Sequence, residues 1–148
     1  MRMREPMLQV YIHLVWGTWD RAPILVPDMK RSVYSCIQAK CKSLKVIIHA
    51  IGGTEDHVHL LVELPATITI AEFVKLIKGS SSHLASHRGE QREEFKWQGA
   101  YGAFSVSKSV VPSVIEYIEG QEQHHQAGTT IRDHEIPWEE PVPAAWKE

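Results

Sequence analysis

The hydrophobic pattern of the chain changes its period several times along the sequence. Stretches rich in β-branched, aliphatic and aromatic residues predict strands, and stretches with apolar residues three or four positions apart predict helices. The predicted strands are 8–19, 46–53, 56–64 and 103–107. The predicted helices are 28–44, 70–86 and 111–126.

Polar, cyclic and small residues mark particular places in these helices. Asp28 and Thr69 each precede an apolar helical stripe and are expected to be N-caps. Pro112 lies in the first turn of the last helix, where its missing N–H costs nothing. Gly120 lies inside the same helix, where glycine costs roughly 1 kcal/mol relative to alanine. It indicates a kink, or a close approach by another group.

The order of the elements predicts an α+β fold. Strand, helix, strand, strand, helix, strand, helix is the order of a ferredoxin-like, split βαβ unit with one extra helix at the end. Its sheet has four antiparallel strands, and the short connection 52–55 allows the second and third strands to pair as a hairpin. Residues 1–127 are expected to form one domain. Residues 128–148 contain IPWEEPVP and are expected to form an irregular extension rich in proline and glutamate.

The composition is that of an ordinary globular protein. The chain has 148 residues, of which 43% are hydrophobic and 23% charged, and its formal net charge is −2. This charge lacks the basic excess that is typical of nucleic-acid-binding proteins. Basic residues do lie close together in one part of the sequence: Lys75, Lys78, His83, His87 and Arg88.

The cysteines and the N-terminal residues favour the cytoplasm. Cys36 and Cys41 are five positions apart in a predicted helix, a spacing that suits neither a CxxC redox motif nor a zinc site. The first residues, MRMREPMLQ, lack the apolar segment of a signal peptide. No stretch approaches the ~20 apolar residues that span a bilayer. We therefore expect reduced thiols and no association with a membrane.

The third predicted strand carries a pair of histidines. Side chains alternate between the two faces of a strand, so one face carries His57, His59, Leu61 and Glu63, and the other Val58, Leu60, Val62 and Leu64. Because the second face is wholly aliphatic, the histidine face is free to form a metal site. The same pair could instead be a polar edge or two hydrogen-bonded interior imidazoles. Glu63 is a weak candidate ligand, and Asp56 is expected to be a turn residue or a support for a ligand.

The last predicted helix offers further polar side chains. Tyr117 and Gln121 are four positions apart and share one surface, with His124 and His125 one turn further on. The buried stripe of this helix is expected to contain Val111, Val114, Ile115 and Ile118. Tyr117 lies at the margin of that stripe, where its hydroxyl could reach outward. By spacing alone, Tyr117 fits an amphipathic structural residue and the two histidines fit the surface.

These motifs together resemble a known family. His57-Val58-His59 on a strand, KGSSSHL at the end of the second helix, WQGAYGAFSVS and then Tyr117 followed by Gln121 occur in the order and spacing of the single-tyrosine HUH transposases. These are the two-hundred class of bacterial insertion sequences and their REP-associated relatives. The resemblance runs from about residue 11 to 126. It implies a small ferredoxin-like enzyme that transfers strands of single-stranded, hairpin-bearing DNA.

The resemblance also implies roles for individual residues. His57, His59 and Gln121 would bind Mg²⁺ or Mn²⁺, with positions left for phosphate oxygens. Tyr117 would be the nucleophile and would form a 5′-phosphotyrosine bond with the DNA. Family members usually act as homodimers, in which the tyrosine helix of one chain can face the histidines of the other. Whether this chain shares its active sites in that way is left open by the sequence.

Candidate DNA contacts lie outside these motifs. Lys75, Lys78 and Ser80 are in the second helix, where basic and hydroxyl side chains could contact phosphates, although a solvated helix is an equal alternative. Trp97 and Tyr101 could stack on unpaired bases, or could belong to the core.

Three other functions compete with the transposase interpretation. A replication initiator or relaxase also carries an HUH motif, but usually in a longer chain. A non-catalytic module that binds single-stranded nucleic acid could share the fold, although the middle strands lack the paired aromatic residues of an RRM domain. A metal-dependent phosphodiesterase that uses water would leave Tyr117 dispensable.

Overall fold

The computed structural model describes residues 4, 6–87, 95–128, 130 and 135. Its elements follow one another in the order β1 (Tyr11–Gly17), α1 (Pro27–Ser43), β2 (Ile47–Gly53), β3 (His57–Glu63), α2 (Ile70–Ser86), β4 (Gly102–Val106), α3 (Val111–Glu119) and α4 (Gln121–Ala127). Short 3-10 turns occupy Trp19–Arg21 and Lys108–Val110. The four strands and the first two helices lie where the hydrophobic pattern predicts them, with ends that differ by a few residues.

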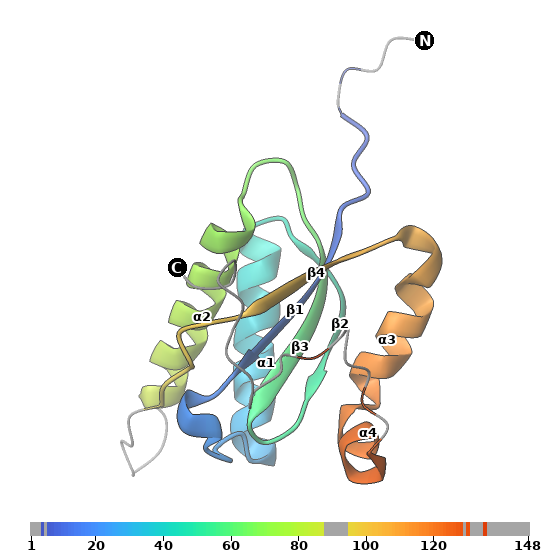
Figure 1. Cartoon of the computed structure of the whole chain (residues 1–148). Helices are drawn as coiled ribbons and strands as arrows, with labels where there is room; N and C mark the ends of the chain where they lie inside the picture. Colours follow the sequence, from blue (N-terminus) through green and yellow to red (C-terminus); the bar gives the residue numbers. More distant parts are fainter. Residues whose placement is uncertain (1–3, 5, 88–94, 129, 131–134, 136–148) are drawn as a thin grey trace.

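The strands form one antiparallel sheet in the order β2-β3-β1-β4. The two central strands are therefore β3 and β1, and their register places Val15 opposite His59 and Gly17 opposite His57. Figure 1 shows α1 and α2 on one side of the sheet and α3 and α4 on the other. This arrangement confirms the predicted ferredoxin-like fold with its additional C-terminal helical segment.

The predicted division of β3 into two faces is confirmed by the packing. Val58, Leu60 and Val62 belong to the larger core, which the sheet forms with α1 and α2. Leu61 points to the other face and packs in a smaller core with Val114 and Ile118 of α3. Because apolar side chains occupy both faces, β3 is buried on both sides. The histidines share their face with α3.

The start of α1 differs from the prediction. Pro27 is the first helical residue, Val26 is the N-cap, and Asp28 lies in the first turn. The expectation that Asp28 is the N-cap is therefore wrong. The fixed φ of proline favours the first helical position, so the helix begins one residue before the aspartate. Thr69 is an N-cap as expected, and its hydroxyl oxygen accepts a hydrogen bond of 3.1 Å from the Glu72 N–H.

The last predicted helix is divided in two at Gly120. α3 ends at Glu119 and α4 begins at Gln121, while Gly120 has φ −98° and ψ 20°. A β-carbon at Gly120 would lie 3.3 Å from the Glu116 carbonyl oxygen and 3.4 Å from His124 Cδ2, which is closer than usual. The kink that glycine indicated is confirmed, and a single continuous helix over 111–126 is not formed.

Other expectations can be compared with the described residues. Cys36 and Cys41 both lie on α1 as free thiols. No helix in the described part of the chain is long and apolar enough to cross a membrane. The predicted extension 128–148 lies outside the described residues, apart from positions 128, 130 and 135.

Candidate active site

The histidine pair of β3 is fully buried, and each ring is fixed by neighbours at Nδ1. His57 Nδ1 lies 2.7 Å from Asp56 Oδ1 and 2.9 Å from Thr54 Oγ1. His59 Nδ1 lies 2.8 Å from Nε2 of His13, which β1 supplies. Partners of this kind orient metal-binding imidazoles in proteins. They leave Nε2 of each ring directed to the side of the sheet on which α3 and α4 lie.

Tyr117 of α3 and Gln121 of α4 both approach the histidine pair of β3. The rings of Tyr117 and His59 are 5.9 Å apart and nearly perpendicular. Gln121 is the first residue of α4, and its Oε1 lies 3.3 Å from His57 Nε2. One chain thus brings together His57, His59, Tyr117 and Gln121, which sequence analysis singled out.

The surroundings of Tyr117 differ from the prediction. The side chain is buried, with 3% of its residue surface exposed, and so belongs to the buried face of α3 and not to its margin. Ile115, expected in that stripe, is only partly buried. The Tyr117 hydroxyl donates a hydrogen bond of 2.6 Å to Glu135 Oε1. The hydroxyl is therefore held inside the site.

Gly52 allows α3 to lie this close to the sheet. It stands on β2 opposite His59, and a β-carbon there would overlap the carbonyl oxygen of Ile118. Any larger residue at this position would push α3 away from β2. Since Tyr117 precedes Ile118 on α3, the glycine determines how near the hydroxyl comes to the histidines.

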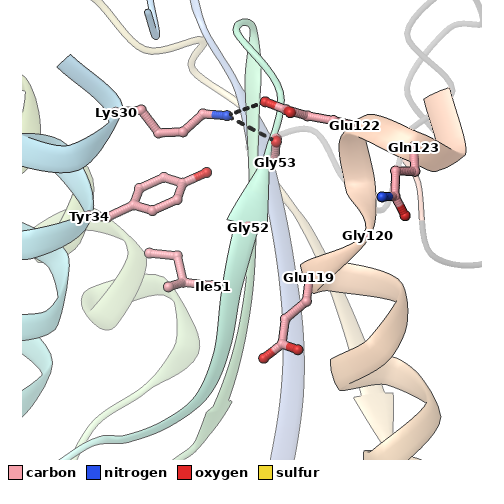
Figure 2. A pocket seen from close by; sticks show the side chains of 9 residues that line it. All are labelled: Lys30, Tyr34, Ile51, Gly52, Gly53, Glu119, Gly120, Glu122 and Gln123. Atoms are coloured by element: carbon pink, nitrogen blue, oxygen red, sulfur yellow. Dashed lines mark hydrogen bonds and ion pairs between the residues drawn. The ribbon is translucent and has the colours of Figure 1, made fainter. Parts of the chain in front are cut away.

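Lys30 of α1 connects α4 to the sheet. Its ammonium donates hydrogen bonds to the Gly53 carbonyl (3.2 Å) and to Glu122 Oε1 (3.0 Å), as Figure 2 shows. The three residues surround one end of a hollow that Tyr34, Ile51 and Glu119 also line. The hollow itself contains none of the predicted site residues. The bonds from Lys30 hold the first turn of α4, which carries Gln121, against the end of β2.

Sequence analysis missed two residues of the site, His125 and Glu135. His125 was expected at the surface, but it is half-buried and its Nε2 lies 3.1 Å from Gln121 Oε1. The spacing of four between Gln121 and His125 was a signal that they share one helical surface. Glu135 follows α4 in the region expected to be an irregular extension, and no pattern in the sequence connected it with the histidines. His124, also expected at the surface, packs against the Tyr117 ring at 4.8 Å.

Electrostatics favour the protonation states that bind cations. Burial lowers the pKa of His59, against the opposing effect of Glu135, and burial likewise lowers the pKa of His125. Burial raises the pKa of the Glu135 carboxyl, but its contact with His59 and the hydrogen bond from Tyr117 outweigh burial and bring the pKa to about 2. Near neutral pH the rings of His59 and His125 are therefore neutral and the Glu135 carboxylate is ionised.

The donor set fits a divalent metal ion. Nitrogen and oxygen ligand atoms of His57, His59, His125 and Glu135 all lie within 4.8 Å of one another. His59 Nε2 and Glu135 Oε2 are buried and 3.1 Å apart, but this contact lacks hydrogen-bond geometry and neither atom has another hydrogen-bond partner among the described residues. Two unsatisfied polar atoms that face each other are what a cation between them would satisfy.

Asp56 and Glu63 take different places. Asp56 supports His57, and Arg21 approaches Asp56 Oδ2 to 3.1 Å. Burial raises the pKa of the Asp56 carboxyl, but the hydrogen bond with His57 and the charge of Arg21 bring it to about 2. Glu63 pairs with His49 at 3.7 Å, away from the histidine pair, so it is not a ligand here.

The candidate DNA contacts lie on α2 and beside it, on the opposite side of the sheet (Figure 1). Lys78 Nζ donates hydrogen bonds to the Gln98 carbonyl (2.5 Å) and the Ala100 carbonyl (3.3 Å). Ser80 Oγ donates to the Leu76 carbonyl of its own helix. Lys75 and Lys78 line a cleft together with Tyr101. Their contact with DNA stays a prediction.

Trp97 is a core residue. It packs against Trp16 at 5.8 Å, and its indole N–H donates a hydrogen bond of 2.9 Å to Ser81 Oγ. Of the two alternatives for this residue, the structure therefore favours the core over a stacking platform for bases.

Comparison with known proteins identifies the family of the chain. A family model described as "Transposase IS200 like" matches residues 7–121, which include the histidine pair, Tyr117 and Gln121. The chain belongs to the IS200-like transposases. These are enzymes that cleave DNA, so the protein is an enzyme of DNA transposition. The family assignment agrees with the resemblance in the motifs.

Two relatives support this assignment to the IS200-like transposases. The ISDra2 transposase TnpA of Deinococcus radiodurans is 29% identical over 125 residues, which cover 80% of this chain and 88% of the relative. The transposase for insertion sequence element IS200 of Salmonella typhimurium is 24% identical over 124 residues, which cover 80% of this chain and 81% of the relative.

A solved structure shares the fold. A REP-associated tyrosine transposase bound to a REP hairpin superimposes with a TM-score of 0.63 at 14% identity. The match covers 88% of this chain and 75% of the other. It supports the fold of this IS200-like transposase and carries no residue roles over to it.

Proposed function

We propose that this transposase cleaves and rejoins single-stranded DNA through a covalent bond between Tyr117 and a 5′ phosphate. The observation that carries the proposal is the convergence of the Tyr117 hydroxyl with the Nε2 atoms of His57 and His59 in one buried site. Such a site combines a nucleophile with a place for a cation, which is what transfer of a phosphodiester requires.

His57, His59 and Gln121 would hold a divalent ion, for which Mg²⁺ and Mn²⁺ are the candidates. A bound ion would polarise the scissile phosphate and offset its developing charge. Thr54, Asp56 and His13 would keep the two imidazoles in place through their Nδ1 atoms. Burial keeps His59 neutral, so that its lone pair is available as a ligand.

Tyr117 would supply the attacking oxygen. Its Oη would form a bond to phosphorus, the bond from phosphorus to the 3′ oxygen would break, and that oxygen would take up the proton that the phenol loses. The covalent product keeps a phosphodiester between DNA and protein. A second 3′ hydroxyl can therefore attack it and rejoin the DNA without ATP.

The substrate that we propose is single-stranded DNA with a hairpin at the element end. The fold is shared with a transposase whose structure was determined with a REP hairpin. The homodimer implied by the family resemblance stays a prediction. The described residues of one chain bring Tyr117 to the histidines, so we propose that each active site is built from a single chain.

The test is to incubate the protein with hairpin-bearing single-stranded DNA and Mg²⁺ or Mn²⁺, and to look for an adduct that resists denaturant. We expect an adduct in the wild type, none in Tyr117→Phe, and none after chelation of the metal. Tyr34→Phe is the matched control, because Tyr34 lies on α1 outside the site. Cleavage without an adduct would favour attack by water, and binding without cleavage would favour a non-catalytic module.

A further inference from the structure

Two side chains reach the histidine pair from the C-terminal end of the fold. His125 lies one turn beyond Gln121 on α4, and its ring centre is 4.7 Å from that of His57. Glu135 comes from beyond Gly128, which ends α4 in the left-handed conformation with φ 69°. The carboxylate is largely buried, with 12% of its side chain exposed. The site is therefore closed by residues that follow the tyrosine helix.

The Glu135 carboxylate contacts all three imidazoles and the nucleophile. Its Oε2 lies 3.1 Å from His59 Nε2 and 3.9 Å from His57 Nε2. Its Oε1 lies 3.5 Å from His125 Nε2 and accepts the hydrogen bond of 2.6 Å from Tyr117. A single carboxylate thus stands between the histidines and the phenol.

Two of these atoms are unsatisfied. His59 Nε2 and Glu135 Oε2 are buried and 3.1 Å apart, yet their contact lacks hydrogen-bond geometry and neither has another hydrogen-bond partner among the described residues. A buried polar atom without a partner costs free energy, and a pair of them facing each other is uncommon in a native interior. A cation that bound both atoms would remove this cost.

We propose that His125 and Glu135 are ligands of the same divalent ion as His57 and His59. The inference rests on the proposed function, because this ion is the one that cleavage would use. It adds an imidazole and a carboxylate to the ligands that the family resemblance implies. Gln121 remains one of the proposed ligands, and its Oε1 lies 3.1 Å from His125 Nε2 and 3.3 Å from His57 Nε2.

The shared carboxylate has a consequence for the nucleophile. Glu135 is the hydrogen-bond acceptor of Tyr117 as well as a ligand, so metal binding and the orientation of the phenol depend on the same side chain. Since imidazole ligands suit first-row transition ions, Mn²⁺ is the appropriate probe of this donor set.

The test measures Mn²⁺ affinity of the full chain without DNA, by the loss of the free-ion signal in electron paramagnetic resonance. Glu135→Gln and His125→Asn are each expected to weaken binding by about tenfold or more, as removal of groups that bind or orient a metal usually does. Glu135→Asp, which keeps a carboxylate, should lose less Mn²⁺ affinity than Glu135→Gln. Glu116→Gln and His83→Asn are matched controls on exposed positions and should bind as the wild type does. Circular dichroism checks that every variant is folded.

Three results would overturn the inference. In the first, both variants keep the wild-type affinity. In the second, Glu135→Gln keeps that affinity and forms the DNA adduct faster, which would mean that the carboxylate occupies the place of the phosphate and is no ligand. In the third, the wild type fails to bind Mn²⁺. Adduct formation by the wild type is scored separately, so failure of the ligand assignment is distinguishable from failure of the proposed function.

Discussion

The chemistry of the site depends on how individual imidazoles are buried and held. His59 is fully buried in the folded chain, and its Nδ1 is hydrogen-bonded to His13, a residue 46 positions away in the sequence. Desolvation disfavours the charged imidazolium, which lowers the pKa of His59. The metal-binding form of the ring is thus prepared by the fold before any ion arrives.

This burial predicts a pH dependence of stability in the metal-free protein. The pKa of His59 in the folded state lies below the ordinary value of 6.5, so as the pH falls through that value the unfolded chain binds a proton that the folded chain does not. The free energy of unfolding should therefore decrease between pH 7 and pH 5. Urea unfolding in the presence of a chelator measures the free energy of unfolding at each pH.

Substitutions test whether His59 causes this pH dependence of the free energy of unfolding. His59→Asn should reduce the dependence and leave the part that His125 contributes, because burial lowers the pKa of His125 as well. His83→Asn, on the exposed surface of α2, should leave it unchanged. Glu135 does not interfere in this window, because a carboxyl with an ordinary pKa of 4.5 is already ionised in the unfolded chain above pH 5. An equal slope in His59→Asn and the wild type would contradict the account.

At the scale of the elements, the site is formed where α3 packs against the sheet. Gly52 allows this contact, since a side chain there would overlap the Ile118 carbonyl. Gly120 then divides the helical segment, so that Gln121 and His125 lie on a separate short helix, α4. The position of the phenol and the position of the amide are thus set by two glycines.

Gly52→Ala is expected to disturb the enzyme at this contact. Displacing α3 should lower the free energy of unfolding by about 1–3 kcal/mol, as overpacking does, and should reduce adduct formation because Tyr117 moves with the helix. Gly79→Ala is the control: it lies on α2, and a β-carbon there meets nothing within 4 Å. The free energy of unfolding of that variant should rise by up to about 1 kcal/mol. Wild-type stability and activity in Gly52→Ala would show that the contact is unimportant.

The elements were predictable from the sequence because their signals are local. The alternation along β3 separates the histidines from Val58 and Leu60, and the Thr69 cap and the Gly120 kink are each visible within one turn. The contacts of the site are not local. The pairing of His13 with His59 depends on strand register, and the contact of Glu135 with His59 joins residues that are far apart in the sequence. Asp28 was mistaken for a cap because the preceding proline competes for the first turn.

At the scale of the whole molecule, the main question is whether one chain suffices for an active site. The described residues bring Tyr117 of α3 and the histidines of β3 together within the same fold. In a dimer with shared sites, the tyrosine would instead come from the other chain. The two arrangements make different predictions for mixtures of inactive chains.

Mixing Tyr117→Phe with His57→Ala separates the two arrangements. Each variant lacks one half of the site, so a site built within one chain cannot be restored, and we expect no adduct from the mixture. If sites are shared between chains, a mixed dimer would contain one complete site, made of Tyr117 from the His57→Ala chain and the histidines of the Tyr117→Phe chain. Such a mixture would form the adduct. Adduct formation above the level of either variant alone would contradict the single-chain site. The two variants should be unfolded and refolded together to allow exchange.

The central claim is that the oxygen of Tyr117 becomes covalently bonded to DNA. The most direct measurement is peptide mapping of the protein–DNA adduct by mass spectrometry after digestion of the DNA to a short remnant. The account predicts a 5′-phosphonucleotide on the peptide that contains Tyr117 and on that residue. A remnant on another residue, or efficient cleavage with no remnant on any peptide, would contradict it.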